Sequence, residues 1–180
     1  MEEPLRYVVM SVDEDASLEA IRRELVSLLP RLRRYAIALS GSIADGDDLT
    51  QDTLERALKN LHQWRPGTRM SSWLFRIAKN RFIDTRRAAH HLRTVSVEDA
   101  EGYPNGQFDG TRAMEASVAL RDAARALQAL PLEQREALAL VLIDGSSYRD
   151  AADILGIPIG TLTSRIARGR EALADLLPGN

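Results

Sequence analysis

The sequence predicts an all-α protein built from two small helical domains that are joined by a flexible acidic linker. Apolar residues recur every three or four positions through most of the 180 residues, which is the spacing of a buried helix face. No convincing alternating run predicts a strand. Residues 94–112 lack this period and are rich in glycine and acidic side chains, as linkers are. Near the carboxyl terminus two helical segments flank the turn Leu155–Pro158, which is the pattern of a helix-turn-helix.

In the amino-terminal half, residues 1–17 are predicted to be an acidic, flexible tail, and residues 18–93 to form the first domain. Its first helix is expected over about 18–39, with a break or kink at Pro30 because proline lacks a backbone N–H. The further expected elements are a loop at 41–46, a helix from Asp48 to about His62 capped by Asp45 or Asp47, a Pro-Gly loop at 63–70, and a helix from Trp73 to about His91 capped by Ser71 or Ser72.

The second domain is predicted over residues 113–180. Helical periodicity resumes near Ala113, and Pro131 is expected to open a helix over 132–143, which Asp144-Gly145 ends. In the final turn Gly156 suits a left-handed helix cap, and Pro158 stands where the next helix begins.

The last helix has two contrasting faces. One is an apolar stripe, predicted to be core, that consists of Ile159, Leu162, Ile166, Gly169, Leu173 and Leu176/Leu177. Between Thr161 and Arg170 there are three arginines and no acidic residue. An ordinary helical hairpin with a solvated face would share the periodicity, but small hydroxyls beside arginines favour contact with DNA bases and phosphates. The candidate DNA-binding residues are Thr161, Thr163, Ser164, Arg165, Arg168 and Arg170.

Charge is distributed unevenly along the chain. The formal net charge of −2 argues against a nucleic-acid-binding protein, yet residues 21–95 carry fifteen basic and seven acidic residues. Within 63–95 there are eight basic residues and the single acid Asp84, interleaved with Trp73, Phe75 and Phe82. Aromatic and amide side chains beside cations suit single-stranded DNA. Most of these aromatics are expected in the core, with the loop and Asn80 facing the nucleic acid.

Composition excludes several classes of site. The chain has no cysteine, so it has no disulfide or thiolate metal site, and this fits a cytoplasmic location. His90 and His91 point to different helix faces, so no metal is expected, and no cofactor either. No apolar stretch approaches the roughly 20 residues of a membrane span, and the acidic amino terminus does not resemble a signal peptide.

Five segments, in order along the chain, resemble conserved regions of bacterial RNA polymerase sigma factors. Residues 47–58 (DDLTQDTLERAL), 73–80 (WLFRIAKN) and Arg86-Arg87 resemble the second region, whereas 130–137 (LPLEQREA) and the helix-turn-helix resemble the fourth. The presence of only these two regions is the plan of the extracytoplasmic-function (ECF) group.

The resemblance implies that the protein binds core RNA polymerase and promoter DNA, and that an anti-sigma factor regulates it. Position by position it implies three sets of residues. Those implied to bind the polymerase clamp are Asp48, Leu49, Gln51, Asp52, Leu54 and Glu55. Those implied to contact the −10 element are Arg65, Thr68, Arg69, Lys79, Asn80, Arg86 and Arg87. The helix-turn-helix candidates above are implied to meet the −35 element, where the small Ala167 leaves more of the specificity to DNA shape.

Other functions remain open on the residues alone. A sigma-like decoy that sequesters a regulator would not need an intact DNA-binding face. A stand-alone duplex-binding regulator would leave the basic aromatic block unexplained. An enzyme is least favoured, because no nucleophile–base–orienter set and no glycine-rich phosphate loop stand out, and pairs such as Asp150 and Asp153 are typical of a solvated helix surface.

Overall fold

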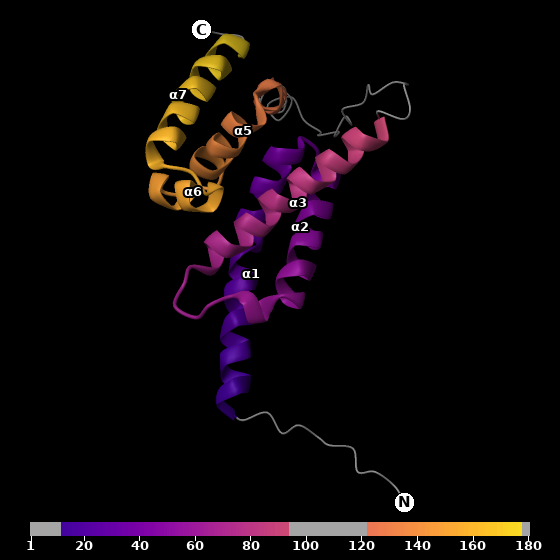
Figure 1. Cartoon of the computed structure of the whole chain (residues 1–180), viewed down its shortest axis with the longest axis vertical. Coiled ribbons are helices and arrows are strands. Elements are labelled where there is room, and N and C mark those ends of the chain that lie inside the picture. The colour runs from indigo at the N-terminus through magenta and orange to yellow at the C-terminus, as the bar shows by residue number, and fades with distance from the viewer. Residues whose placement is uncertain (1–11, 94–121, 178–180) are drawn as a thin grey trace, which may run out of the picture.

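The structure, a computed structural model, describes residues 12–93 and 122–177. All regular elements in these ranges are helical, which confirms the predicted all-α class (Figure 1). They are α1 (Val12–Ser40), α2 (Ile43–Lys59), the 3₁₀ helix η1 (Leu61–Gln63), α3 (Met70–Arg93), a helix over 122–129, α5 (Leu132–Leu138), the π-helix η2 (Ala139–Ile143), α6 (Tyr148–Leu155) and α7 (Ile159–Leu176).

The first helix is longer than predicted. It begins at Val12 rather than near Leu18, and it continues through Pro30 without the expected break. Pro30 cannot donate to the carbonyl of Val26, but both residues are exposed, so water can satisfy that carbonyl. The predicted tail is therefore wrong for residues 12–17, and the predicted break at Pro30 is wrong.

The next two helices also begin earlier than predicted. Gly41, with a φ of 82°, ends the first helical segment, and Ser42 then caps α2 by accepting a 3.2 Å hydrogen bond from the N–H of Asp45. The predicted caps Asp45 and Asp47 are wrong, because both lie inside the helix. Ser71 and Ser72 likewise lie inside α3, which begins at Met70.

The helix-turn-helix matches its prediction closely. Gly156 adopts φ 69° and ψ 37°, the left-handed cap expected of it, and Pro158 occupies the N-cap position of α7. Residues 132–143 are helical as predicted, with the last five in the π-helix, and Asp144 ends them. The predictions for 94–112 and for the start of the following helix lie outside the described residues.

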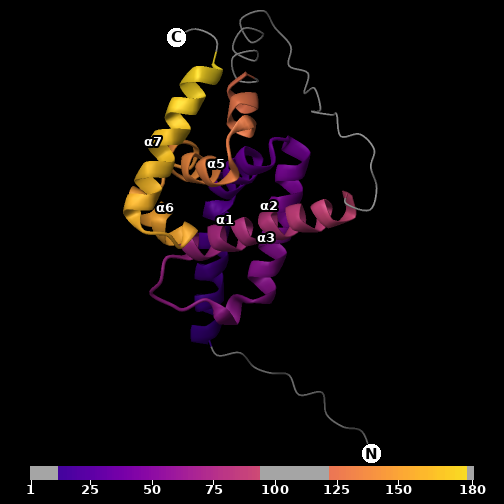
Figure 2. The ribbon, with the colours of Figure 1, turned by 45° about the horizontal axis from the view of Figure 1, so that its top comes forward.

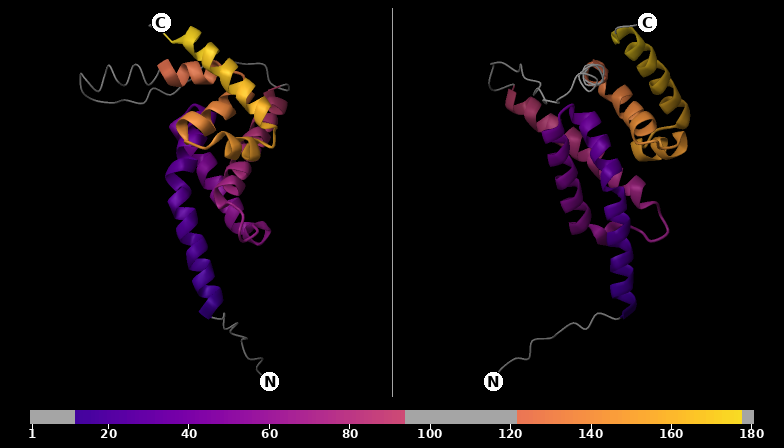
Figure 3. Two further views of the ribbon diagram at one scale, coloured as in Figure 1. Left: turned by 90° about the vertical axis from the view of Figure 1, so that its left-hand side faces the viewer. Right: turned by 180° about the vertical axis from the view of Figure 1, so that it is seen from behind.

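Both halves of the chain contribute to one buried core. Helices α1, α2 and α3 form a bundle, and α5, α6 and α7 pack at one side of it (Figures 1, 2 and 3). Helix α6 contacts α3, whereas α5 and η2 both contact α1. Leu32, Tyr35 and Leu39 of α1 are fully buried in the same cluster as Leu138 and Leu140. Burial of this kind is the main favourable term in folding.

Polar contacts fix the position of the carboxyl-terminal half on α1. The Arg31 guanidinium donates two 2.9 Å hydrogen bonds to the carboxylate of Asp144. Gln128 donates to the carbonyl of Ala38 at 2.8 Å, and Arg135 donates to that of Leu39 at 3.1 Å. These contacts place the helix-turn-helix beside α3. No helix within the described ranges is long and apolar enough to cross a membrane.

Candidate nucleic-acid interface

The second helix of the helix-turn-helix, α7, presents its polar face to solvent. Leu162, Ile166 and Gly169 are buried, and a Cβ on Gly169 would lie 2.7 Å from Leu138, so this side packs closely on α5. The two ends of the predicted apolar stripe differ, because Ile159 and Leu176 are exposed. The face opposite the core is thereby free to approach a ligand.

Five of the six candidate residues on α7 are exposed: Thr161, Thr163, Ser164, Arg168 and Arg170. Without a ligand the hydroxyls bond to their own helix, since Thr163 donates to Ile159 at 2.9 Å and Ser164 to Gly160 at 3.0 Å. Such hydroxyls can exchange these bonds for bonds to a base or a phosphate.

Arg165 differs from the other candidates on α7. Its side chain is only 18% exposed and pairs with Glu133 of α5 at 2.8 Å. The sequence could not reveal this partner, because Glu133 lies 32 positions earlier in the chain. Arg165 thus helps to hold α7 on α5.

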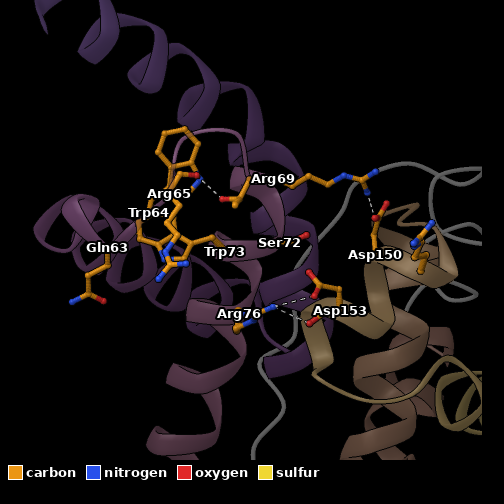
Figure 4. A pocket seen from close by; sticks show the side chains of 11 residues that line it. Gln63, Trp64, Arg65, Arg69, Ser72, Trp73, Arg76, Asp150 and Asp153 are labelled. Atoms are coloured by element: carbon orange, nitrogen blue, oxygen red, sulfur yellow. Dashed lines mark hydrogen bonds and ion pairs between the residues drawn. The ribbon is translucent and has the colours of Figure 1, made fainter.

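The loop between η1 and α3 borders an open cavity of about 550 Å³ (Figure 4). Gly67 has a φ of 86°, and Thr68 closes the turn through a 3.1 Å hydrogen bond from its N–H to the Arg65 carbonyl. Trp64 and Trp73 are half-buried and line the cavity together with cationic side chains. The complete lining is Gln63, Trp64, Arg65, Thr68, Arg69, Ser72, Trp73, Arg76, Arg149, Asp150 and Asp153.

The candidate residues on α3 fall into two groups. Lys79 is half-buried and donates to the carbonyl of Leu155 at 3.2 Å, so it already contacts α6. Asn80, Arg86 and Arg87 are exposed, and the Arg86 guanidinium lies 5.8 Å from the centre of the Phe82 ring. The structure brings Arg65, Thr68 and Arg69 of the loop together in the cavity wall. Arg86 and Arg87 lie outside this wall, near the carboxyl end of α3.

On α2, the candidate polymerase-binding residues do not all face solvent. Asp48, Gln51 and Glu55 are exposed and Leu54 is half-buried. Leu49 is only 8% exposed, and Asp52 pairs with Arg81 of α3. These last two support the helix more than they offer a surface.

Sequence reasoning overlooked several residues of these surfaces. Leu58, four positions after Leu54 on α2, is 57% exposed, and its helical spacing from Leu54 could have identified it. Arg76 lines the cavity, and its position one turn before Asn80 was a usable signal. No local signal places Arg149, Asp150 and Asp153 there, because they come from the other half of the chain.

Comparison with known proteins relates both halves to sigma factors. Residues 25–79 match a family model described as the Sigma2 domain of PhyR, and residues 120–173 match one for Sigma-70, region 4. The chain is 40% identical over 159 residues to the ECF RNA polymerase sigma factor EcfG of Rhodopseudomonas palustris, covering 88% of this chain and 86% of that protein. The chain belongs to the ECF sigma factors.

Other relatives of this ECF sigma factor agree. It is 39% identical over 147 residues to SigM of Mycobacterium tuberculosis, covering 82% of this chain and 71% of that one. Among solved structures it is similar to the sigma factor RpoE of Bartonella quintana in complex with the anti-sigma factor NepR, with a TM-score of 0.74, 34% identity and coverage of 88% and 96% of the two chains. It is also similar to CnrH in complex with the cytosolic domain of CnrY, with a TM-score of 0.65, 26% identity and coverage of 88% of each chain.

Proposed function

We propose that this sigma factor binds core RNA polymerase in the cytoplasm and directs it to promoters by reading two DNA elements in different forms. The −35 element is read as duplex by α7, and the −10 element as single strand by the 63–70 loop and α3. The observation that carries this proposal is that one chain combines an exposed helix face, with three arginines and no acidic residue between 161 and 170, and an aromatic-walled, arginine-lined cavity. The first suits the major groove and the second suits an unstacked base.

On α7, Thr163, Ser164 and Arg168 are placed to meet base edges. Thr161 and Arg170 flank them and suit phosphates, which position a protein on the duplex but carry no sequence information. Arg165 reaches a phosphate only by giving up its 2.8 Å pair with Glu133. Its main role in this proposal is to orient the recognition helix.

At the −10 element, Arg65, Thr68 and Arg69 surround the cavity that receives an extruded base. Extrusion costs a few kcal/mol, so stacking and hydrogen bonds in the cavity must offset it. Trp64 and Trp73 supply the aromatic surface, and each base–aromatic stack contributes about 1–3 kcal/mol. Lys79 and Asn80 hold the unpaired strand, and Arg86 and Arg87 follow its upstream phosphates.

The polymerase-binding surface is the exposed side of α2. Asp48, Gln51 and Glu55 provide polar contacts, and Leu54 with Leu58 provides an apolar strip beside them. Leu49 and Asp52 stabilise the position of α2 instead, Leu49 by packing in the core and Asp52 through its ion pair with Arg81. We also propose that residues 18–93 and 113–180 are the two functional domains, with 94–112 as linker.

The regulating partner is an anti-sigma factor. RpoE of Bartonella quintana, which is 34% identical to this chain, is bound to the anti-sigma factor NepR in its solved structure, and CnrH is bound to part of CnrY. A protein of the same class is therefore the proposed inhibitor of this chain. The proposed function requires no metal, cofactor or membrane insertion.

Transcription in vitro tests the proposed function. Purified protein is added to core RNA polymerase on a library of promoter fragments, and start sites are mapped. Initiation on a subset of fragments that core polymerase alone does not use would support the proposal. Failure to bind core polymerase would contradict it and favour a decoy that sequesters a regulator.

A further inference from the structure

The helix-turn-helix covers part of the proposed −10 surface. Asp150 of α6 pairs with Arg69, and Asp153 pairs with Arg76 at 3.4 Å (Figure 4). Carbonyl groups near the end of α6 accept from the same helix α3, since Arg76 donates to the Asp153 carbonyl at 3.0 Å and Lys79 to that of Leu155 at 3.2 Å. Three cations of the −10 surface are thus already engaged within the protein.

These contacts put a wall of the second half of the chain on the base-binding cavity. Arg149, Asp150 and Asp153 line the cavity opposite the loop residues. A DNA strand that enters it would bring phosphates to cations that the two carboxylates occupy, and like charges in contact repel. The −10 strand and α6 therefore compete for one surface.

A second contact holds the two halves in this arrangement. The Asp144 side chain is fully buried, whereas that of its partner Arg31 is 38% exposed. A buried carboxylate without its partner is strongly unfavourable, so this pair is much more important to the closed arrangement than exposed pairs, which contribute little. Ser146 also donates to Asp144, but a neutral hydroxyl does not balance the charge.

We propose that the described arrangement is an autoinhibited, closed form of this sigma factor, which the Arg31–Asp144 pair stabilises together with the shared core, and that α6 must leave α3 before the −10 strand binds. This inference rests on the proposed −10 function of the cavity. In the closed form only the fraction of molecules that open binds the strand, and the apparent affinity falls by that fraction.

Arg33 offers a matched control for Arg31. It is also on α1, and it makes the same two-pronged contact with a carboxylate, but its partner Asp47 lies on α2 within the same bundle. Both side chains of that pair are about half exposed. Arg33→Ala removes an arginine–carboxylate pair without touching the contact between the two halves.

The test measures opening and strand binding separately. Because the chain has no cysteine, dyes placed at Arg56→Cys on α2 and Ala174→Cys on α7, both exposed positions, report the distance between the halves by energy transfer. A fluorescent single strand with the −10 sequence, found by start-site mapping, reports binding. Arg31→Ala should raise the ratio of open to closed molecules at least about tenfold and tighten strand binding by up to the same factor.

A second variant separates opening from damage to α1. Asp144→Asn keeps Arg31, which lies 5.9 Å from the centre of the Phe75 ring, and should open the protein by a smaller factor. Arg33→Ala should leave both readings unchanged. Unchanged energy transfer in Arg31→Ala and Asp144→Asn would contradict the proposal that this pair stabilises the closed form. Opening without tighter strand binding would contradict the proposal that α6 blocks the −10 strand. Failure of the wild-type protein to initiate transcription with core polymerase would instead contradict the proposed function.

Discussion

The proposed −35 and −10 surfaces differ in how far the protein itself already occupies them. On α7, Thr161, Ser164 and Arg168 are exposed, and the segment 161–170 contains no acidic residue. On α3 and its preceding loop, Arg69, Arg76 and Lys79 contact α6. A surface that reads base edges in duplex DNA binds other sequences weakly even when it is exposed. A surface that stacks unpaired bases and binds phosphates accepts single strands of many sequences. In the closed form proposed above, α6 covers part of the surface proposed to bind single strands and leaves the surface proposed to read duplex open.

The largest expected effect comes from removing a base-reading side chain on the open surface. Arg168→Ala should reduce initiation at a promoter that depends on its −35 element by roughly tenfold to a hundredfold, because a good arginine–base contact contributes about 1–3 kcal/mol. Run-off transcription with saturating core polymerase measures this. Arg34→Ala, which removes an exposed arginine of α1, is the control. Equal activity of Arg168→Ala and the wild type would remove α7 from the reading of the promoter.

On the proposed −10 surface, Asn80→Ala should impair promoter opening more than duplex binding. A lost hydrogen bond to the unpaired strand is worth about 1 kcal/mol, or roughly fivefold. Permanganate reactivity of unpaired thymines measures opening, and gel shift of the duplex measures binding. Loss of duplex binding as large as the loss of opening would contradict the assignment of this surface to single strands.

The Arg165–Glu133 pair distinguishes a positioning role from a phosphate contact. Arg165→Ala and Glu133→Gln should each destabilise the protein by up to about 1 kcal/mol, since the pair is partly exposed. If Arg165 mainly orients α7, both variants should weaken −35 binding by a similar small factor. A loss in Arg165→Ala together with tighter binding in Glu133→Gln would instead identify Arg165 as a phosphate-binding residue. Thermal unfolding and duplex titration measure the two effects.

The smallest effect concerns stability and pH. Burial raises the pKa of Glu136 above its ordinary 4.5, although the positive charges of Lys79 and Arg165 offset part of this. The folded state therefore holds this proton more tightly than the unfolded state, and wild-type stability falls as pH rises from 4.5 through the raised pKa. Glu136→Gln should be more stable than the wild type at neutral pH and no more stable well below 4.5. Thermal unfolding at both pH values measures this.

The exposed Glu24 provides the control for that experiment. Glu24→Gln should change stability little at either pH, because its carboxyl is in solvent in both states. A stabilisation by Glu136→Gln that is as large at acidic as at neutral pH would show that shape rather than charge explains it.

Local signals in the sequence predicted local structure well where one residue type has one role. Gly156 and Pro158 predicted both sides of the helix-turn-helix turn, because only a left-handed cap and a helix start suit them there. Where several residues compete for one role the prediction was wrong. Ser42, Asp45 and Asp47 all suit an N-cap, and the choice fell to Ser42 because Gly41 ends α1 directly before it.

Contacts between the halves were beyond the reach of the sequence. Arg31 and Asp144 are 113 positions apart, and nothing distinguishes Arg31 from the neighbouring arginines of α1 until the fold brings η2 to it. The same holds for the carboxylates of α6 that meet Arg69 and Arg76. The candidate DNA-binding residues could be proposed from sequence, but their availability depends on packing that only the structure describes.

The most direct test of the two-surface account is a crossed titration. The wild type, Arg168→Ala and Asn80→Ala, each assembled with core polymerase, are titrated with two probes: a duplex with only the −35 element and a single strand with only the −10 element. The account predicts that Arg168→Ala weakens binding of the duplex but not of the strand, and that Asn80→Ala weakens binding of the strand but not of the duplex. Equal weakening of both probes by both variants would contradict the assignment of separate DNA forms to α7 and α3.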